Sequence, residues 1–303
     1  MIAAIRGRKG YLVRALQVLA IGLIFFFLLR TLYINWHQIS AYQWSPDYRS
    51  LGAALSLLLA NGLLYVHLWR LIVSGLGASL SYRKSFRVIL LSQLGRYLPG
   101  KVWMLLGAVY LGSQEGVPKL LLGVSVTLQM VWQVLSGVFI FLLSLPFWGD
   151  LQGVSHLRFL FLLIPLGLLL SHPALVSRGF NFALHLTGQE PMELRWSYGH
   201  MAMQLLLWGL FWTVNGTAYF LLIRGLTPIS LSQLPVVIGI FAISFVAGFL
   251  ALFAPAGLGV VEGSLAFLLA FHLPGPVAAI VALSSRLMRT VVEALCALIA
   301  WRL

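Results

Sequence analysis

The chain has 303 residues, of which 60% are hydrophobic and 9% are charged, and its mean hydropathy is +0.96. A soluble domain usually carries about 25% charged residues, so this composition predicts an integral membrane protein with no room for a soluble catalytic domain. The 20 lysines and arginines against 7 acidic residues give a net charge of +13. Most of the basic residues flank apolar segments, as the positive-inside rule expects, so we expect no nucleic-acid partner. The single cysteine, Cys296, excludes an intrachain disulfide.

Six apolar segments are typical of full membrane spans. They cover residues 11–34, 51–73, 120–147, 157–170, 197–223 and 277–301. The first follows a basic cluster and is not followed by a signal-peptide cleavage site, so we expect a retained span with its N-terminus in the cytoplasm. An even number of spans also places the C-terminus in the cytoplasm. The sequence therefore predicts a multi-pass protein of the cell (inner or plasma) membrane.

Two further apolar segments are interrupted near their middle. Residues 86–111 contain Gly-Arg-Tyr-Leu-Pro-Gly-Lys at 95–101, and residues 234–272 contain Ala-Pro-Ala-Gly-Leu-Gly at 254–259. Irregular backbone at membrane depth is tolerated only where it is buried in protein or lines a polar cavity. We therefore predict two re-entrant hairpins. Their tips contain Pro99, Gly100, Pro255, Gly257 and Gly259.

The alternative to six spans and two hairpins is a set of eight ordinary spans. With eight spans Lys119 moves outside, and the positive-inside count favours the hairpins only mildly. The fold class expected here is all-α and integral to the membrane, with eight hydrophobic segments.

Matching residues recur at a fixed spacing of 156 residues (255 minus 99). The pairs are Pro99 with Pro255, Gly107 with Gly263, and Pro118 with Pro274. This spacing predicts two repeat halves, residues 1–150 and 151–303, within one membrane domain that covers residues 1–303. Three crossings in each half would insert the second half upside down. Transporters with such inverted repeats place broken helices from both halves around one substrate site.

Six charged residues lie far from any predicted membrane interface, where charges are costly and usually paired or functional. They are Arg96, Lys101, Glu262, Arg286, Arg289 and Glu293. Four basic and two acidic side chains favour a cavity for an anion, such as a lipid phosphate, over one for a cation. Arg286, Arg289 and Glu293 share one helix face, which we expect to point inward. The alternative is a purely structural Arg289–Glu293 ion pair, with Glu262 as a candidate partner for Arg286.

The hairpin tips and the following span supply further candidates. Lys101 stands where a new helical arm begins, so its ammonium group and the first N–H groups of that arm could bind an anion together. Gly257 and Gly259 could do the same from the second tip. The alternative is that Lys101 reaches the lipid headgroups and that the glycines only permit a tight turn. Gln129 and Gln133, at i and i+4, form a polar stripe that we expect to join helices.

Motifs of the common enzyme classes do not occur in the sequence. It has no His-Glu-x-x-His, no Gly-x-Ser-x-Gly and no Walker A loop. We therefore predict no catalytic residue, no metal site and no cofactor.

Three motifs resemble one membrane-protein family over essentially the whole chain. They are Gly95-Arg-Tyr-Leu-Pro-Gly-Lys-Val-Trp103, Ala254-Pro-Ala-Gly-Leu-Gly-Val-Val-Glu-Gly263, and Ser285-Arg286. The chain is similar to the membrane domain of lysylphosphatidylglycerol synthase/flippase proteins. In bifunctional members this domain is thought to move an aminoacylated phospholipid between leaflets, while a separate cytosolic domain makes that lipid. The resemblance therefore implies a stand-alone translocation module, although relatives of this type have also been assigned as glycosyltransferases.

These observations together predict a flippase for an anionic phospholipid or a lipid-linked envelope precursor. Lys101 and Arg286 would bind the phosphate, Arg289 would shape the site with Glu293, and Arg96 would add a further cation. Glu262 would balance or gate the site. One alternative is a membrane glycosyltransferase or other lipid-carrier transferase, and another is a scaffold for envelope assembly. The expected partners are the lipid, a second copy of the chain, or envelope-biosynthesis enzymes.

Overall fold

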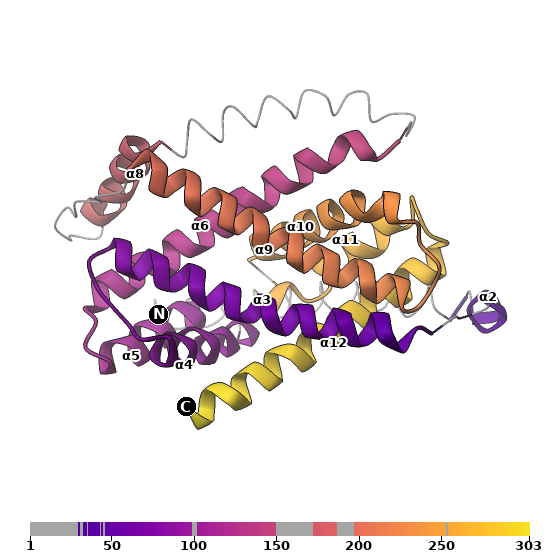
Figure 1. Cartoon of the computed structure of the whole chain (residues 1–303), viewed down its shortest axis with the longest axis horizontal. Helices are drawn as coiled ribbons and strands as arrows, with labels where there is room; N and C mark the ends of the chain where they lie inside the picture. The colour runs from indigo at the N-terminus through magenta and orange to yellow at the C-terminus, as the bar shows by residue number, and fades with distance from the viewer. Residues whose placement is uncertain are drawn as a thin grey trace, which may run out of the picture.

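The computed structural model describes residues 30, 33–34, 36–42, 44, 46–98, 102–149, 172–186, 197–252 and 254–303. Helices and connecting segments account for these residues, and no strand occurs among them (Figure 1). The predicted span at 157–170 and most of the one at 11–34 lie outside the described residues. Pro99, Gly100 and Lys101, predicted at the first tip, also lie outside them.

Four helices of the described part are long and apolar enough to cross a membrane. They are α3 (Tyr48–Gly75), α6 (Lys119–Ser144, continued by η2, Leu145–Phe147), α9 (Tyr198–Arg224) and α10 (Leu234–Leu250, preceded by η4, Leu231–Gln233). The first three confirm the predicted helices at 51–73, 120–147 and 197–223. A fifth long helix, α12 (Gly275–Arg302), covers the predicted segment at 277–301 and carries the inward charges. The count of six spans stays a prediction.

Two short helices complete the described part outside the main bundle. They are α2 (Trp36–Ala41) and α8 (Pro173–Leu186). Between α2 and α3, Asp47 caps the first turn of α3, because its carboxylate accepts the backbone N–H of Arg49 at 3.0 Å and the hydroxyl of Ser50 at 2.6 Å.

The first interrupted segment folds as a helical hairpin, which we call the first hairpin (residues 82–114). Its arms are α4 (Tyr82–Gln93) and α5 (Val102–Gln114), and η1 (Leu94–Tyr97) follows α4. Lys84 at the start of the hairpin forms a 2.9 Å ion pair with Glu115 just past its end. Nearer the tip, a Cβ atom on Gly95 would lie 2.6 Å from the backbone nitrogen of Met104. The arms therefore run antiparallel and touch through their backbones, which glycine permits.

The second interrupted segment also folds back on itself, and we call it the second hairpin (residues 234–269). Its arms are α10 and α11 (Val260–Leu269), with η5 (Pro255–Gly257) between them. At the tip, a Cβ atom on Gly248 would lie 2.2 Å from a methyl carbon of Val261. At the open end, Trp148 contacts His272 just past α11, and Ser144 lies against Gly239 of α10. Both arms therefore reach the end of the molecule where α6 finishes. The re-entrance of both hairpins stays a prediction.

The two hairpins open toward opposite ends of the molecule, and their tips meet in the middle (Figure 1). Elements η1 and η5 are in contact, and α12 packs against α11, α4 and α3. The order long helix, arm, 3₁₀ turn, arm, long helix occurs twice along the chain. Both α6 and α12 begin directly after a proline, Pro118 and Pro274, with nearly equal backbone angles. The inverted repeat of halves 1–150 and 151–303 stays a prediction.

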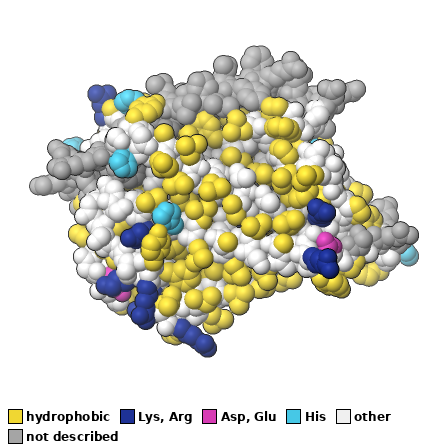
Figure 2. All heavy atoms as spheres, in the orientation of Figure 1, with side chains coloured by type: hydrophobic (Ala, Val, Ile, Leu, Met, Phe, Trp, Pro, Cys, Tyr) yellow, Lys and Arg dark blue, Asp and Glu magenta, His cyan; other side chains and the backbone are white. Residues whose placement is uncertain are grey.

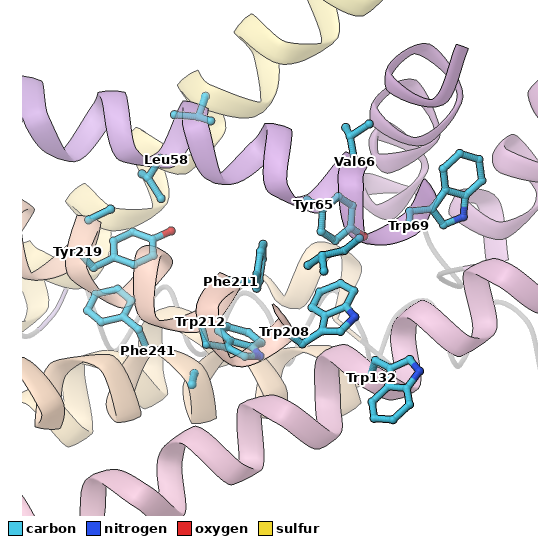
Figure 3. Packing of buried hydrophobic residues seen from close by; sticks show 14 of the residues in the cluster. Leu58, Tyr65, Val66, Trp69, Trp132, Trp208, Phe211, Trp212, Tyr219 and Phe241 are labelled. Carbon is cyan, nitrogen blue, oxygen red and sulfur yellow. The ribbon is translucent and has the colours of Figure 1, made fainter. Parts of the chain in front are cut away.

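Buried tryptophans link the long helices (Figure 3). Trp69 of α3 donates its indole N–H to Ser125 of α6 at 3.1 Å. Trp212 of α9 donates to Ser136 Oγ at 3.0 Å and to the backbone oxygen of Gln133 at 3.1 Å. The link to α9 therefore uses a serine and a carbonyl of α6. The role of the Gln129 and Gln133 side chains in joining helices stays a prediction.

The outer surface suits a lipid environment. Figure 2 shows apolar side chains over the middle of the visible face and basic side chains gathered toward its two ends. Large apolar side chains such as Leu206 and Leu298 are 70% and 64% exposed. Exposed apolar area of this extent marks a membrane contact.

At one end of the molecule, Arg83 of α4 donates to the backbone oxygen of Leu303 at 2.9 Å. This hydrogen bond joins the start of the first hairpin to the end of α12.

Candidate functional site

An open cavity of about 130 Å³ lies where the hairpins meet α3, α9 and α12. Five of the six charges predicted at membrane depth line it. They are Arg96, Glu262, Arg286, Arg289 and Glu293. Three arginines against two glutamates give these five residues a net charge of +1. Among the sequence-predicted residues, Gln133 also lines the cavity, whereas Gln129 does not.

Glu293 is the centre of the larger charged cluster. Its Oε1 accepts Arg96 Nη1 of η1 at 3.0 Å and Arg289 Nε of α12 at 2.9 Å. Its Oε2 accepts the hydroxyl of Tyr97 at 2.5 Å. The three charged side chains are 17–21% exposed. The predicted Arg289–Glu293 pair thus forms, and Arg96 and Tyr97 connect it to the tip of the first hairpin.

Arg286 and Glu262 form the second cluster, at the tip of the second hairpin. Arg286 Nη1 lies 3.3 Å from Glu262 Oε1 and donates to the backbone oxygen of Ala256 at 3.2 Å. Glu262 is 1% exposed, and its Oε2 accepts the N–H of Gly259 at 2.6 Å. Ala256 adopts φ 51°, a left-handed conformation that costs energy for a residue with a Cβ. Glu262 therefore serves as the expected partner of Arg286 and also caps α11.

The glycines of the second tip form turns. Gly257 and Gly259 have φ of 67° and 81°, which favour glycine. The N–H of Gly257 donates to Ala254, and the N–H of Gly259 donates to Glu262. Both donors are used within the hairpin and neither glycine lines the cavity, which supports the turn-forming alternative over anion binding. Pro255 opens the 3₁₀ turn that precedes them.

Sequence reasoning missed the aromatic and amide side chains of the site. Tyr97 holds Glu293, and its position directly after Arg96 in the first motif was the signal that could have found it. The guanidinium of Arg289 lies 4.7 Å from the ring centre of Phe245, within range of a cation–π contact. Asn61 lines the cavity as well.

The arrangement is suited to binding an anion. Arginine presents a planar fork of N–H donors that matches carboxylate and phosphate oxygens equally well. Both carboxylates of the site are already held by arginines and by hydrogen bonds. No group of three or more histidine, cysteine, aspartate or glutamate side chains that could hold a metal ion occurs in the part of the chain that the structure describes.

Long apolar helices, an apolar outer surface and a charged internal cavity define an integral membrane protein. The chain belongs to the family described as the lysylphosphatidylglycerol synthase TM region, whose model matches residues 14–296. The match covers nearly the whole chain and confirms the resemblance seen in the sequence motifs. Membership of this family indicates a lipid-related function in the membrane. No curated protein matches the chain.

Proposed function

We propose that the protein moves an anionic lipid, either a phospholipid or a lipid-linked envelope precursor, between the leaflets of the cell membrane. The observation that carries the proposal is the open cavity at the meeting point of the two hairpins, with three arginines on its wall. The lipid tails stay in the bilayer while the headgroup crosses, so the protein needs a groove and no closed pore. Without a visible ATP site in the sequence, the movement is downhill or coupled to an ion.

Exchange of anions keeps the cost of this movement low. An unpaired arginine at membrane depth is expensive, so a resting site needs its own carboxylates. When a phosphate arrives, Arg286 leaves Glu262 and binds the phosphate. Arg96 or Arg289 leaves Glu293 and binds the phosphate in the same way. The Arg286–Glu262 pair and the Arg96–Glu293 pair each join a hairpin to α12. Opening a pair therefore frees a hairpin tip at the moment when the headgroup is bound.

The proposed topology has six spans and two re-entrant hairpins, with both termini in the cytoplasm. Support comes from the Lys84–Glu115 pair, which joins the two ends of the first hairpin, and from the contact between η1 and η5. Cysteine labelling tests it in a Cys296→Ala background. Gln114→Cys, on an exposed position, should label from the cytoplasmic side only, and Gly275→Cys should label from the outside only. Labelling of both from one side contradicts the topology.

The glycosyltransferase alternative needs a free carboxylate. Glu262 would be the carboxylate for this role, and its side chain is 1% exposed, caps α11 and pairs with Arg286. A buried carboxylate held by a cation in this way is poorly placed to act as a general base. The geometry therefore favours binding over transfer.

A leaflet-accessibility assay in proteoliposomes tests the proposed function. Fluorescent anionic and zwitterionic lipids are compared for the wild type, Lys101→Ala and Arg286→Ala. Arg178→Gln on exposed α8 is the control, because it removes a cation far from the cavity. A charge-assisted hydrogen bond contributes about 1.5–3 kcal/mol, so Arg286→Ala should slow anionic-lipid movement by about tenfold or more. Wild-type protein that moves no lipid, or variants that move it normally, would favour the transferase or the scaffold.

A further inference from the structure

One part of the cavity wall is polar but carries no charge, unlike the part formed by the arginine clusters. Asn61 and Tyr65 are four residues apart on α3 and therefore share one face of the helix. Gln93 of α4 donates its side-chain N–H to the hydroxyl of Tyr65 at 2.5 Å. All three residues line the cavity. We call them the amide wall.

Two acceptors of the amide wall have no hydrogen-bond donor among the described residues. They are Asn61 Oδ1 and Gln93 Oε1, and the two residues are only 3% and 7% exposed. Leaving a buried carbonyl oxygen without a donor is costly, and native structures contain few such atoms. Two of them on one cavity wall indicate a ligand that supplies hydrogen-bond donors.

Aromatic rings line the same cavity as the amide wall, and Figure 3 shows Tyr65 of that wall near Phe211. Tyr219 of α9 and Phe241 of α10 stack with ring centres 4.0 Å apart and planes within 7°. Phe211 packs edge-on against Trp212 with ring centres 5.3 Å apart. All four residues line the cavity. Flat apolar rings next to a few placed polar atoms are typical of sites for small organic groups, and they suit the C–H face of a sugar or cyclic polyol.

The local charge distinguishes between hydroxyl and ammonium donors. Gln93 stands three residues before Arg96, and the five charged lining residues sum to +1. An ammonium group on the amide wall would add a cation beside the arginines without a free carboxylate to receive it. Hydroxyl groups donate to the same oxygens without that cost.

We infer that the amide wall binds the hydroxyl groups of a polyol or sugar headgroup while the arginines bind its phosphate. This inference rests on the proposed function and names its substrate class, an anionic lipid with a hydroxylated headgroup. Such a headgroup belongs either to a polyol phospholipid or to a sugar on a polyprenyl phosphate. The two sources share the chemistry and differ in their tails.

Matched lipid probes test the inference in proteoliposomes. Phosphatidylinositol is compared with phosphatidylmethanol, which keeps the phosphodiester charge but has no hydroxyl group. Two hydrogen bonds of about 1 kcal/mol each predict movement of phosphatidylinositol that is faster by about tenfold or more. The second arm of the experiment compares polyprenyl-phosphoryl hexose with polyprenyl methyl phosphate in the same way. The arm with the larger ratio of rates, hydroxylated lipid over lipid without hydroxyl groups, identifies the source of the headgroup.

Variants of the amide wall should remove the discrimination between the two probes of each pair. Gln93→Met and Asn61→Leu should slow phosphatidylinositol to the rate of phosphatidylmethanol. Gln204→Met is the matched control, because Gln204 Oε1 is also buried without a donor among the described residues but lies outside the cavity lining. It should leave the ratio unchanged. Equal wild-type rates for both probes of each pair, or equal slowing of both by the variants, overturn the inference.

A binding measurement on the wild type separates this inference from the proposed function and needs no variant to fold. Glycerophosphoinositol should raise the thermal unfolding midpoint of the detergent-solubilised protein, and glycerophosphomethanol should raise it less. If no lipid moves but this difference in binding is found, the flippase proposal fails and the hydroxyl subsite stands. If lipids move without discrimination and the two headgroups bind equally, the subsite fails and the flippase stands.

Discussion

Neutralising Glu293 should destabilise the protein, because its carboxylate holds together one of the two charged clusters of the cavity. Glu293 accepts three hydrogen bonds, from Arg96 at 3.0 Å, Arg289 at 2.9 Å and Tyr97 at 2.5 Å. Glu293→Gln keeps the shape of the side chain but leaves two guanidinium groups without their shared anion. The five charged lining residues would then carry a net charge of +2, against +1 in the wild type.

The magnitude follows from the burial of the cluster. Removing one partner of a buried ion pair costs about 3–5 kcal/mol. The side chains of Glu293 and Arg96 are 21% and 17% exposed, which favours the lower limit, about 3 kcal/mol. At about 2 °C per kcal/mol for a chain of this size, the unfolding midpoint should fall by about 6 °C. Intrinsic tryptophan fluorescence in detergent measures it.

Two further measurements test this prediction, namely a double-mutant cycle on Arg96 and Glu293 and a control at an exposed ion pair. Arg96→Gln in the Glu293→Gln background should cost about 1–2 kcal/mol less than the sum of the single changes, because the second change removes a cation already without its partner. Glu115→Gln breaks the exposed pair with Lys84, which is 50% exposed, and should cost at most about 1 kcal/mol. A midpoint that falls by less than about 2 °C for Glu293→Gln, or strict additivity, refutes the reasoning.

Three further predictions concern the hairpin contact, the helix links and the cap of α3. Gly95→Ala would place a Cβ atom 2.6 Å from the backbone nitrogen of Met104, so it should destabilise the protein by about 1–3 kcal/mol. Gly123→Ala is the control, because a Cβ atom there meets open space and should cost no stability. Thermal unfolding compares the two variants. Trp212→Phe removes the indole donor to α6 and should cost about 1–3 kcal/mol, measured by unfolding in denaturant. An unchanged stability would contradict a stabilising role for the two hydrogen bonds from Trp212 to α6. The hydroxyl of Ser50 lowers the pKa of Asp47 from its ordinary value of 3.8, so the stability that it adds is present above that pH and is lost as the pH falls through the lowered value. Asp47→Asn should flatten the pH dependence of the unfolding midpoint below the ordinary pKa of 3.8, and an unchanged pH profile would contradict this.

Much of the site could be predicted because membrane depth makes charges conspicuous. Arg96, Glu262, Arg286, Arg289 and Glu293 stood out as charges inside apolar segments, and the structure brings all five to one cavity. The Arg289–Glu293 pair also followed from helical spacing, since residues four apart are neighbours on a helix.

Uncharged residues of the cavity could not be predicted in the same way. Tyr65 and Gln93 are common residue types in apolar helices, and nothing in their local sequence shows that they meet across two helices. The stacking of Tyr219 on Phe241 could not be predicted for the same reason, because it depends on how α9 and α10 pack against each other.

The sequence by itself determined the class of protein, the long helices α3, α6, α9 and α12, and the positions of the two breaks. These are local properties, since apolar length, proline and glycine act on the segment that contains them. Only the tertiary structure decided that Arg96 reaches Glu293 across 197 residues and that Glu262 both caps α11 and faces Arg286. Those partnerships depend on how the helices pack against one another, and a buried charge is stable only beside the partner that this packing supplies.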